Sequence, residues 1–309
     1  MAVGLATWDR LLVLDTPPQP GWQSLVVEYL EAPGGTTANA AVALARLGAE
    51  VALVSAVGDD APGGRVRSAL EREGIETSAL TALPGRQTNL ATIVVSGAPP
   101  ERSILWRPGA SLVRGDRLDI TSIFAADIVL LDVNDMPLRR FLVDLPAHTL
   151  PNAKLLGPLT YLALSGVDDA LEIALRHDII VGNEREVLAI TGCPDLEAAI
   201  ALIQPRMPGV NLRSAAVSLG ARGSLAFTRD ERWNDAGFTV DVVDPTGAGD
   251  AFAGAVAFGL ALRWPWPRTL RFANAAGALS TRALGSQSAL PSRDEVERLL
   301  SANPAISAE

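Results

Sequence analysis

The chain has 309 residues, of which 48% are hydrophobic, and its formal net charge is −9 at pH 7. The length allows one large α/β domain or two modest domains, of which we expect the single domain over residues 1–309. The negative charge argues against a nucleic-acid partner. A single cysteine, Cys193, leaves no intramolecular disulfide and no cysteine-based metal site. No apolar run reaches the ~20 residues that cross a bilayer, and no basic leader opens the chain. We therefore expect a cytoplasmic protein without a membrane partner.

Strand and helix patterns alternate along most of the chain. Apolar strands are predicted at 3–5, 51–57, 128–131, 154–156, 178–181, 215–219 and 225–227. Helices are predicted from Thr36 or Thr37 to Leu47 and over 64–72, 167–176 and 196–203. This repeated spacing predicts a doubly wound, mostly parallel sheet with helices on both faces.

Two stretches, 25–30 and 89–106, interrupt this alternation. Both have an extended β pattern with polar interruptions, and neither leads directly into a helix. We expect the segments at about 10–33 and 88–108 to pair into a small β-sheet over the main domain. Because both flank glycine-rich junctions, a lid over a cleft is favoured over a β-extension without function.

The first glycine-rich turn, 34–39, comes just before the first long helix. Its paired glycines permit the close approach of a ligand, and the amide of Asn39 suits a polyol. Asp9 follows the first strand, where a carboxylate can accept hydrogen bonds from vicinal hydroxyls. The alternatives are a plain helix start for the turn and an unrelated role for Asp9.

Two further turns follow strands in the second half of the chain. Asn183 and Glu186 are three residues apart, so they share a helix face where their oxygens can hold hydrated Mg²⁺; a capping box is the competing interpretation. Glycines also mark the turn 218–223, which is either a tight hairpin or a nucleotide contact.

The most informative segment is 244–252, Asp-Pro-Thr-Gly-Ala-Gly-Asp-Ala-Phe. An apolar β-type run ends at Val243, and a long apolar helix follows the turn, so free N–H groups and the positive end of a helix dipole point above it. Asp250 beside such an anion site suits a base that takes a proton from an attacking hydroxyl; an ordinary strand-to-helix turn with an N-terminal acid is the alternative. Phe252 stands where a dinucleotide fingerprint needs glycine, and the single lysine, Lys154, excludes a Walker A loop.

Together and in this order, these motifs resemble the ribokinase-like (PfkB) family of carbohydrate kinases. The N-terminal signature is similar to 34–39 with 45–48 and 57–60, the C-terminal signature to 244–252, and the magnesium-associated motif to Asn183-x-x-Glu186. The resemblance covers about residues 3 to 295. It implies a ribokinase-like fold and transfer of the γ-phosphoryl group of ATP to a hydroxyl of a sugar or sugar acid, with Mg²⁺ as cofactor.

The resemblance also implies a role for each matched residue. Asp250 would be the base, and the backbone of Gly247, Ala248 and Gly249 the anion hole. The acceptor would be bound by Asp9, Gly35 and Asn39, with Arg107 added for an acidic or phosphorylated substrate. The nucleotide would be bound by Asn183, Ser218, Gly220, Gly223 and Asn274. Asn183 and Glu186 would hold Mg²⁺ through water, and Asp244 and Thr246 a monovalent cation such as K⁺.

The acceptor is left open by the sequence. Thr36 and Thr37 replace the small or basic residues that many sugar-specific subgroups carry, and the acid-bearing segment 132–135 aligns ambiguously. A nucleoside is the alternative acceptor, and a catalytically idle nucleotide or sugar sensor is the alternative from another class. An exposed lid strand would also allow a homodimer through the lid.

Overall fold

The computed structural model describes residues 1–97, 101–145 and 153–303. Its main sheet comprises β1 (Ala2–Gly4), β4 (Leu53–Gly58), β5 (Leu80–Leu83), β8 (Ile128–Asp132), β9 (Lys154–Pro158), β10 (Ile179–Asn183), β11 (Ser214–Ser218), β12 (Ser224–Phe227) and β13 (Arg232–Asp235). The strand order is β13-β12-β11-β10-β9-β8-β1-β4-β5. From β11 to β5 the neighbours run parallel, whereas β12 and β13 each run antiparallel to the strand before them.

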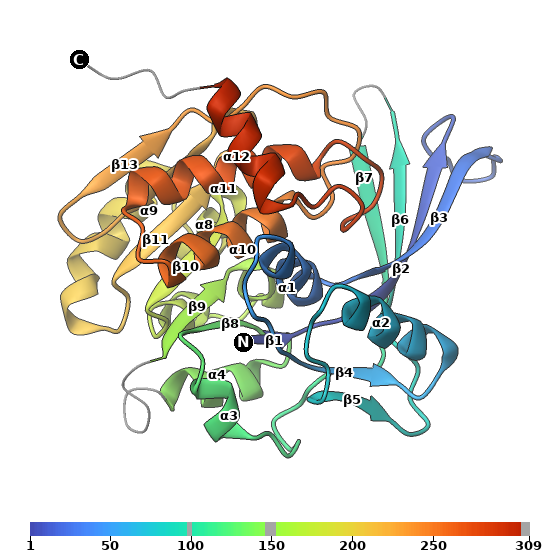
Figure 1. Ribbon diagram of the computed structural model, residues 1–309, viewed down its shortest axis with the longest axis horizontal. Helices are drawn as coiled ribbons and strands as arrows, with labels where there is room; N and C mark the ends of the chain where they lie inside the picture. The colour runs from blue at the N-terminus through green and yellow to red at the C-terminus, as the bar shows by residue number, and fades with distance from the viewer. Residues whose placement is uncertain (98–100, 146–152, 304–309) are drawn as a thin grey trace.

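Helices cover both faces of this sheet, as the sequence predicts (Figure 1). One layer contains α3 (Ile120–Phe124), α4 (Met136–Asp144), α6 (Thr160–Ser165), α7 (Ala170–Ala174), α8 (Glu184–Thr191) and α9 (Leu196–Ile203). The other contains α1 (Thr36–Arg46), α2 (Ala61–Arg72), α10 (Ala248–Ala261), α11 (Trp266–Ser280) and α12 (Arg293–Ala302). Each layer buries its own apolar cluster against the strands, which is the arrangement that stabilises a parallel sheet.

A second sheet of four strands stands beside the main domain (Figure 1). It consists of β2 (Thr7–Leu14), β3 (Val26–Gly34), β6 (Leu90–Ser96) and β7 (Glu101–Arg107), in the order β3-β2-β6-β7. These strands come from the two segments expected to form a small sheet, of which residues 98–100 lie outside the described part. We call it the small sheet.

Two local expectations from the sequence are wrong. The helix expected over 167–176 is limited to α7, and the apolar run before Asp244 is not a strand. The backbone N–H groups of Val243 and Asp244 donate instead to the carbonyl oxygen of Thr281, at 2.8 and 3.1 Å. Because both N–H groups bond to this carbonyl oxygen at the end of α11, the apolar run before Asp244 cannot pair with β13 as a further strand.

The topology concentrates polar groups at one edge of the main sheet. The parallel strands β1, β8, β9, β10 and β11 all end there, and α1, α8 and α10 begin there. Ligands of open α/β sheets bind outside the carboxyl ends of the strands. Most of the predicted site residues therefore meet at this edge.

Candidate active site

Asp250 lies in the first turn of α10. Gly247 precedes this helix with a left-handed φ of 83°, and an added Cβ there would lie 2.6 Å from the carbonyl oxygen of Ser286. The turn therefore requires glycine. No side chain caps the helix start, so the N–H groups of Gly249 and Asp250 have no intrahelical partner and are available to an anion.

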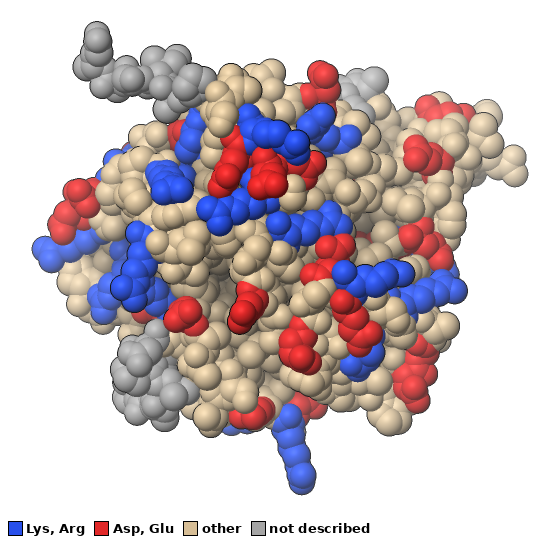
Figure 2. All heavy atoms as spheres, in the orientation of Figure 1, with Lys and Arg blue, Asp and Glu red and all other residues tan. Residues whose placement is uncertain are grey.

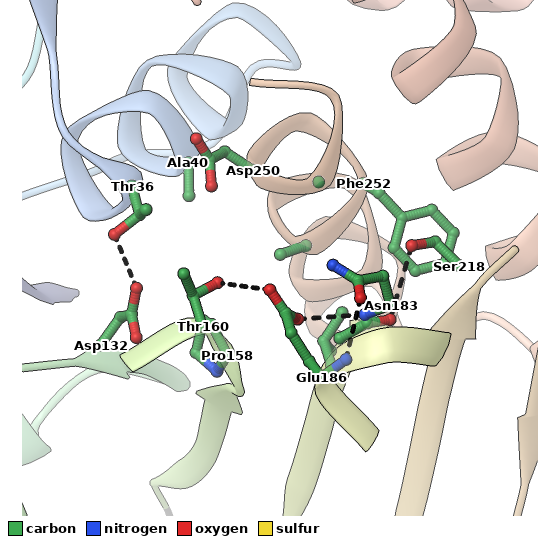
Figure 3. A pocket seen from close by; sticks show the side chains of 14 residues that line it. Thr36, Ala40, Asp132, Pro158, Thr160, Asn183, Glu186, Ser218, Asp250 and Phe252 are labelled. Carbon is green, nitrogen blue, oxygen red and sulfur yellow. Dashed lines mark hydrogen bonds between the residues drawn. The ribbon is translucent and has the colours of Figure 1, made fainter. Parts of the chain in front are cut away.

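Gly249 faces open space. A Cβ built on it would have no atom within 4 Å, and its backbone lines a narrow crevice of about 50 Å³ together with Asp250. Figure 3 shows Asp250 across this crevice from Asp132, Thr160 and Glu186. A phosphoryl group placed against the start of α10 would therefore lie beside the Asp250 carboxylate.

The environment of Asp250 makes it a stronger base than an ordinary aspartate. The pKa of Asp250 is raised to about 7: burial is the largest cause and the nearby charges of Asp132 and Glu186 add to it, whereas a hydrogen bond from Asn39 and the charge of Arg102 act against the rise. The Asn39 Nδ2 atom donates to Asp250 Oδ2 at 2.7 Å. A carboxylate with a pKa near neutrality is matched to proton transfer at physiological pH.

The expected acceptor residues are close together. Gly35 precedes α1 with a φ of 98°, and the carboxylate of Asp9 lies directly over Gly34, where an added Cβ would overlap it. Asp9 is buried and accepts a hydrogen bond from Thr7 Oγ1 at 2.6 Å; burial raises its pKa to about 6. Asn39 lies one turn into α1 and links this group to Asp250.

The structure contains the capping box that competes with a magnesium role for Asn183 and Glu186. Asn183 Oδ1 accepts from the Glu186 N–H at 2.9 Å, and Glu186 Oε2 accepts from the Asn183 N–H at 3.1 Å. Glu186 also accepts from Thr160 Oγ1 at 3.1 Å and lines the crevice, where burial raises its pKa. Among the described residues no cluster of three His, Cys, Asp or Glu side chains could hold a metal. A hydrated Mg²⁺ held through water by Asn183 and Glu186 stays a prediction.

Four of the five expected nucleotide residues line a second, wider cleft of about 350 Å³, whereas Asn183 lines the crevice. Ser218, Gly220, Gly223 and Asn274 all contribute to it. Gly223 has a φ of 88° and no room for a Cβ against the Asp235 carbonyl, and Asn274 Nδ2 donates to Asp235 Oδ1 at 2.6 Å. Ser218, Gly249 and Phe252 line both hollows, so the wider cleft leads directly to the crevice at Asp250.

Asp244 and Thr246, the residues expected to bind a monovalent cation, form a buried turn. Asp244 Oδ1 accepts from the N–H and the hydroxyl of Thr246, at 2.9 and 2.6 Å, and Asp244 Oδ2 accepts from the Gly285 N–H at 2.9 Å. These bonds tie the segment before α10 to the loop after α11. The cation site itself stays a prediction.

Arg107 lies apart from the other expected acceptor residues. Directly opposite residues share one face of a sheet; Arg107 pairs with Leu90 and Leu90 with Trp8, whereas Asp9 pairs with Ala91. Arg107 therefore belongs to the face opposite Asp9, and its Nη2 donates to the Thr88 carbonyl at 3.1 Å. This placement favours a structural role.

A buried ion pair that sequence reasoning missed lies at the floor of the crevice. Asp132 and Arg139 are both fully buried, with 3.3 Å between Asp132 Oδ1 and Arg139 Nη1. Thr36 Oγ1 donates to Asp132 Oδ2 at 2.6 Å (Figure 3). Thr36 is one of the two positions that depart from the pattern of many sugar-specific subgroups, and this departure was the sequence signal available for this polar group. Arg139 is assigned to the ion pair only by the tertiary structure.

The surface is less informative about function than the crevice. Figure 2 shows acidic and basic side chains interspersed over one face of the molecule. In residues 1–97, 101–145 and 153–303, no helix is long and apolar enough to cross a membrane.

Comparison with known proteins agrees with this geometry. Residues 2–293 match the model of the pfkB family carbohydrate kinases. Ribokinase of Haemophilus influenzae is 30% identical over 306 residues, which cover 96% of this chain and 97% of that protein. Fructokinase of Solanum tuberosum is 31% identical over 294 residues, covering 88% and 87%.

The fold is also similar to that of a solved ribokinase structure. The ribokinase structure from Thermotoga maritima superimposes with a TM-score of 0.82 at 26% identity, and the match covers 97% of this chain and 98% of that one. The predicted ribokinase-like architecture is thereby confirmed. The chain belongs to the pfkB family of carbohydrate kinases and is a phosphotransferase that uses an alcohol group as acceptor.

Proposed function

We propose that the protein transfers the γ-phosphoryl group of ATP to a hydroxyl of a sugar or sugar acid, with Asp250 as base. The observation that carries this proposal is the half-buried Asp250 carboxylate, with a pKa of about 7, beside the uncapped start of α10. ATP would occupy the wider cleft, with its γ-phosphoryl group at the crevice. The acceptor would lie between Asp250 and Asp9.

The reaction needs no covalent intermediate. A bond forms between the acceptor oxygen and the γ-phosphorus, the bond from that phosphorus to the bridging oxygen of ADP breaks, and the hydroxyl proton passes to Asp250. The N–H groups at the start of α10 stabilise the charge on the transferred group. Bound through water near Asn183 and Glu186, Mg²⁺ would neutralise phosphate charge. The small sheet, acting as a lid, would exclude water from the acceptor.

Asp250→Asn tests the base. We expect kcat to fall by at least ~10²-fold, while ADP binding measured by calorimetry persists, because the N–H groups remain. Asp241→Asn, at an exposed position before the site, is the matched control and should leave kcat unchanged. Near-normal turnover by Asp250→Asn would remove Asp250 as the base.

The acceptor is identified by an ATP-consumption screen over pentoses, hexoses, sugar acids and nucleosides. Turnover with a sugar or sugar acid would support the proposal, and turnover with nucleosides alone would replace it with nucleoside kinase activity. Binding without turnover across the whole screen would favour a sensor.

We further propose a homodimer formed through the small sheet. Tyr29 and Leu105 are 56% and 62% exposed, and the strand register places both on the face opposite Asp9. Exposed apolar side chains on a sheet face that also carries the Arg10–Glu31 ion pair are typical of an interface. Leu105→Glu should convert a dimer to a monomer in sedimentation analysis, whereas Leu164→Glu, at an exposed position on α6, should not. A wild-type monomer would refute the dimer.

A further inference from the structure

Asn39 uses its side-chain amide to connect two parts of the protein. Its Nδ2 donates to Asp250 Oδ2 at 2.7 Å, and its Oδ1 accepts from Gln287 Nε2 at 2.9 Å and from Ser286 Oγ at 3.2 Å. All four side chains are buried or line the crevice. Asn39 is expected to bind a substrate hydroxyl, but both lone pairs of its side-chain oxygen accept hydrogen bonds from the loop after α11.

Arg46 holds that loop in place from the same helix. Arg46 follows Asn39 by two helical turns and so lies on the same face of α1. Its Nη1 donates to the carbonyl oxygens of Gln287 and Leu290, at 2.9 and 2.8 Å, while its Nε and Nη2 bind Glu73 at 2.9 and 2.7 Å. The backbone of Gln287 is thus fixed by Arg46, and its side chain is directed at Asn39.

The orientation of the Asn39 amide depends on these contacts. An asparagine amide can turn by half a rotation, which exchanges its NH₂ group for its oxygen. Turned that way, it would face the ionised Asp250 with an acceptor, and two acceptors cannot bond. With the amide turned, the Gln287 NH₂ group would face the Asn39 NH₂ group, and two donors cannot bond; the Ser286 hydroxyl can donate or accept and so opposes the rotation less.

We propose that Gln287, Ser286 and Arg46 are positioning residues for the base: they fix the Asn39 amide so that its nitrogen faces Asp250 Oδ2. Asp250 Oδ1 accepts no hydrogen bond from the described residues and stays open to the acceptor hydroxyl. The inference rests on the proposed role of Asp250. It also gives the Ala-Arg-Leu-Gly segment at 45–48, part of the family signature, a physical role.

Gln287→Met tests this inference, because methionine has a similar shape and no donor. The charged groups near Asp250 are Asp132 on β8, Glu186 on α8 and Arg102 on β7, with the neutral Tyr161 on α6, and the variant leaves all of them in place. A weakened Asn39 hydrogen bond should raise the pKa of Asp250, because that bond favours the ionised form.

We expect the acid limb of kcat/KM to move up by about half to one pH unit, so activity falls about three- to tenfold on the acid side and little on the alkaline side. Ser288→Ala, at an exposed position on the same loop, should leave the limb unchanged. A loss of equal size at every pH, or no loss, would overturn the proposal. If Gln287→Met does not fold, Ser286→Ala should show a smaller shift in the same direction.

Carboxyl ¹³C NMR of aspartate-labelled protein gives a readout that needs no turnover, with Asp250→Asn to assign the signal. An upward shift of the Asp250 titration in Gln287→Met supports the positioning role, and an unshifted titration refutes it. If the titration shifts but the acid limb does not follow, the positioning stands and the base assignment fails.

Discussion

Gly249→Ala separates the anion site from the stability of the fold. Gly249 lies in the first turn of α10, and an added Cβ would meet no atom within 4 Å. Alanine is favoured over glycine in a helix by about 0.5–1 kcal/mol, so the substitution should leave the thermal midpoint unchanged or raise it by about 1–3 °C. The folded protein loses nothing because the methyl group enters empty space.

In the proposed mechanism, the transferred phosphoryl group approaches the helix N–H groups through that same empty space. A methyl group there would hold the phosphate away, and losing one such contact typically costs 10²–10³-fold in kcat. We expect kcat/KM for ATP to fall by at least ~10²-fold in a coupled ADP-release assay. Calorimetric unfolding of the same samples provides the stability measurement.

Gly247→Ala is the matched comparison. Gly247 has a φ of 83°, and a Cβ there would lie 2.6 Å from the Ser286 carbonyl oxygen, so this variant should lose several degrees of thermal midpoint; the left-handed conformation alone costs roughly 1–2 kcal/mol. The anion-site reasoning would be refuted by near-normal turnover of Gly249→Ala, or by a drop in its midpoint similar to that of Gly247→Ala.

Three further predictions concern charge. Asp250 must be ionised to accept a proton, so kcat/KM should fall tenfold per pH unit below about 7; a flat profile between pH 5 and 8 would contradict this. Because the folded-state pKa of Asp250 lies above its unfolded value, the folded protein binds the extra proton, and stability should decline as pH rises toward and through 7. Asp250→Asn should therefore raise the thermal midpoint at pH 8 but not at pH 4, which calorimetry at both values would check. Arg107→Gln should change the KM of the acceptor less than about twofold, since the side chain binds the Thr88 carbonyl on the opposite face; a tenfold increase in steady-state assays would show that it reaches the substrate.

The sequence alone predicts those features that depend on neighbouring residues. The glycine turn before α10, the start of α1 and the Asn183–Glu186 pair are each set within a few residues, because backbone conformation and capping act over one helical turn. The alternation of strands and helices likewise predicts a parallel sheet with two helical layers. Because these effects act over a short range, the local sequence could not decide between alternatives, such as a capping box or a magnesium site for Asn183 and Glu186.

Contacts between distant segments required the tertiary structure. The Asn39–Asp250 hydrogen bond joins residues 211 positions apart, and the Asn39–Gln287 bond joins residues 248 positions apart. Strand register decided that Arg107 faces away from Asp9, since a shift of one residue exchanges the two faces of a sheet. Burial, which depends on every element packed around a side chain, raised the pKa of Asp250. The sequence singled out Asp250 as the proposed base, and only the folded chain supplied the burial that raises its pKa and the Asn39 amide that bonds to it.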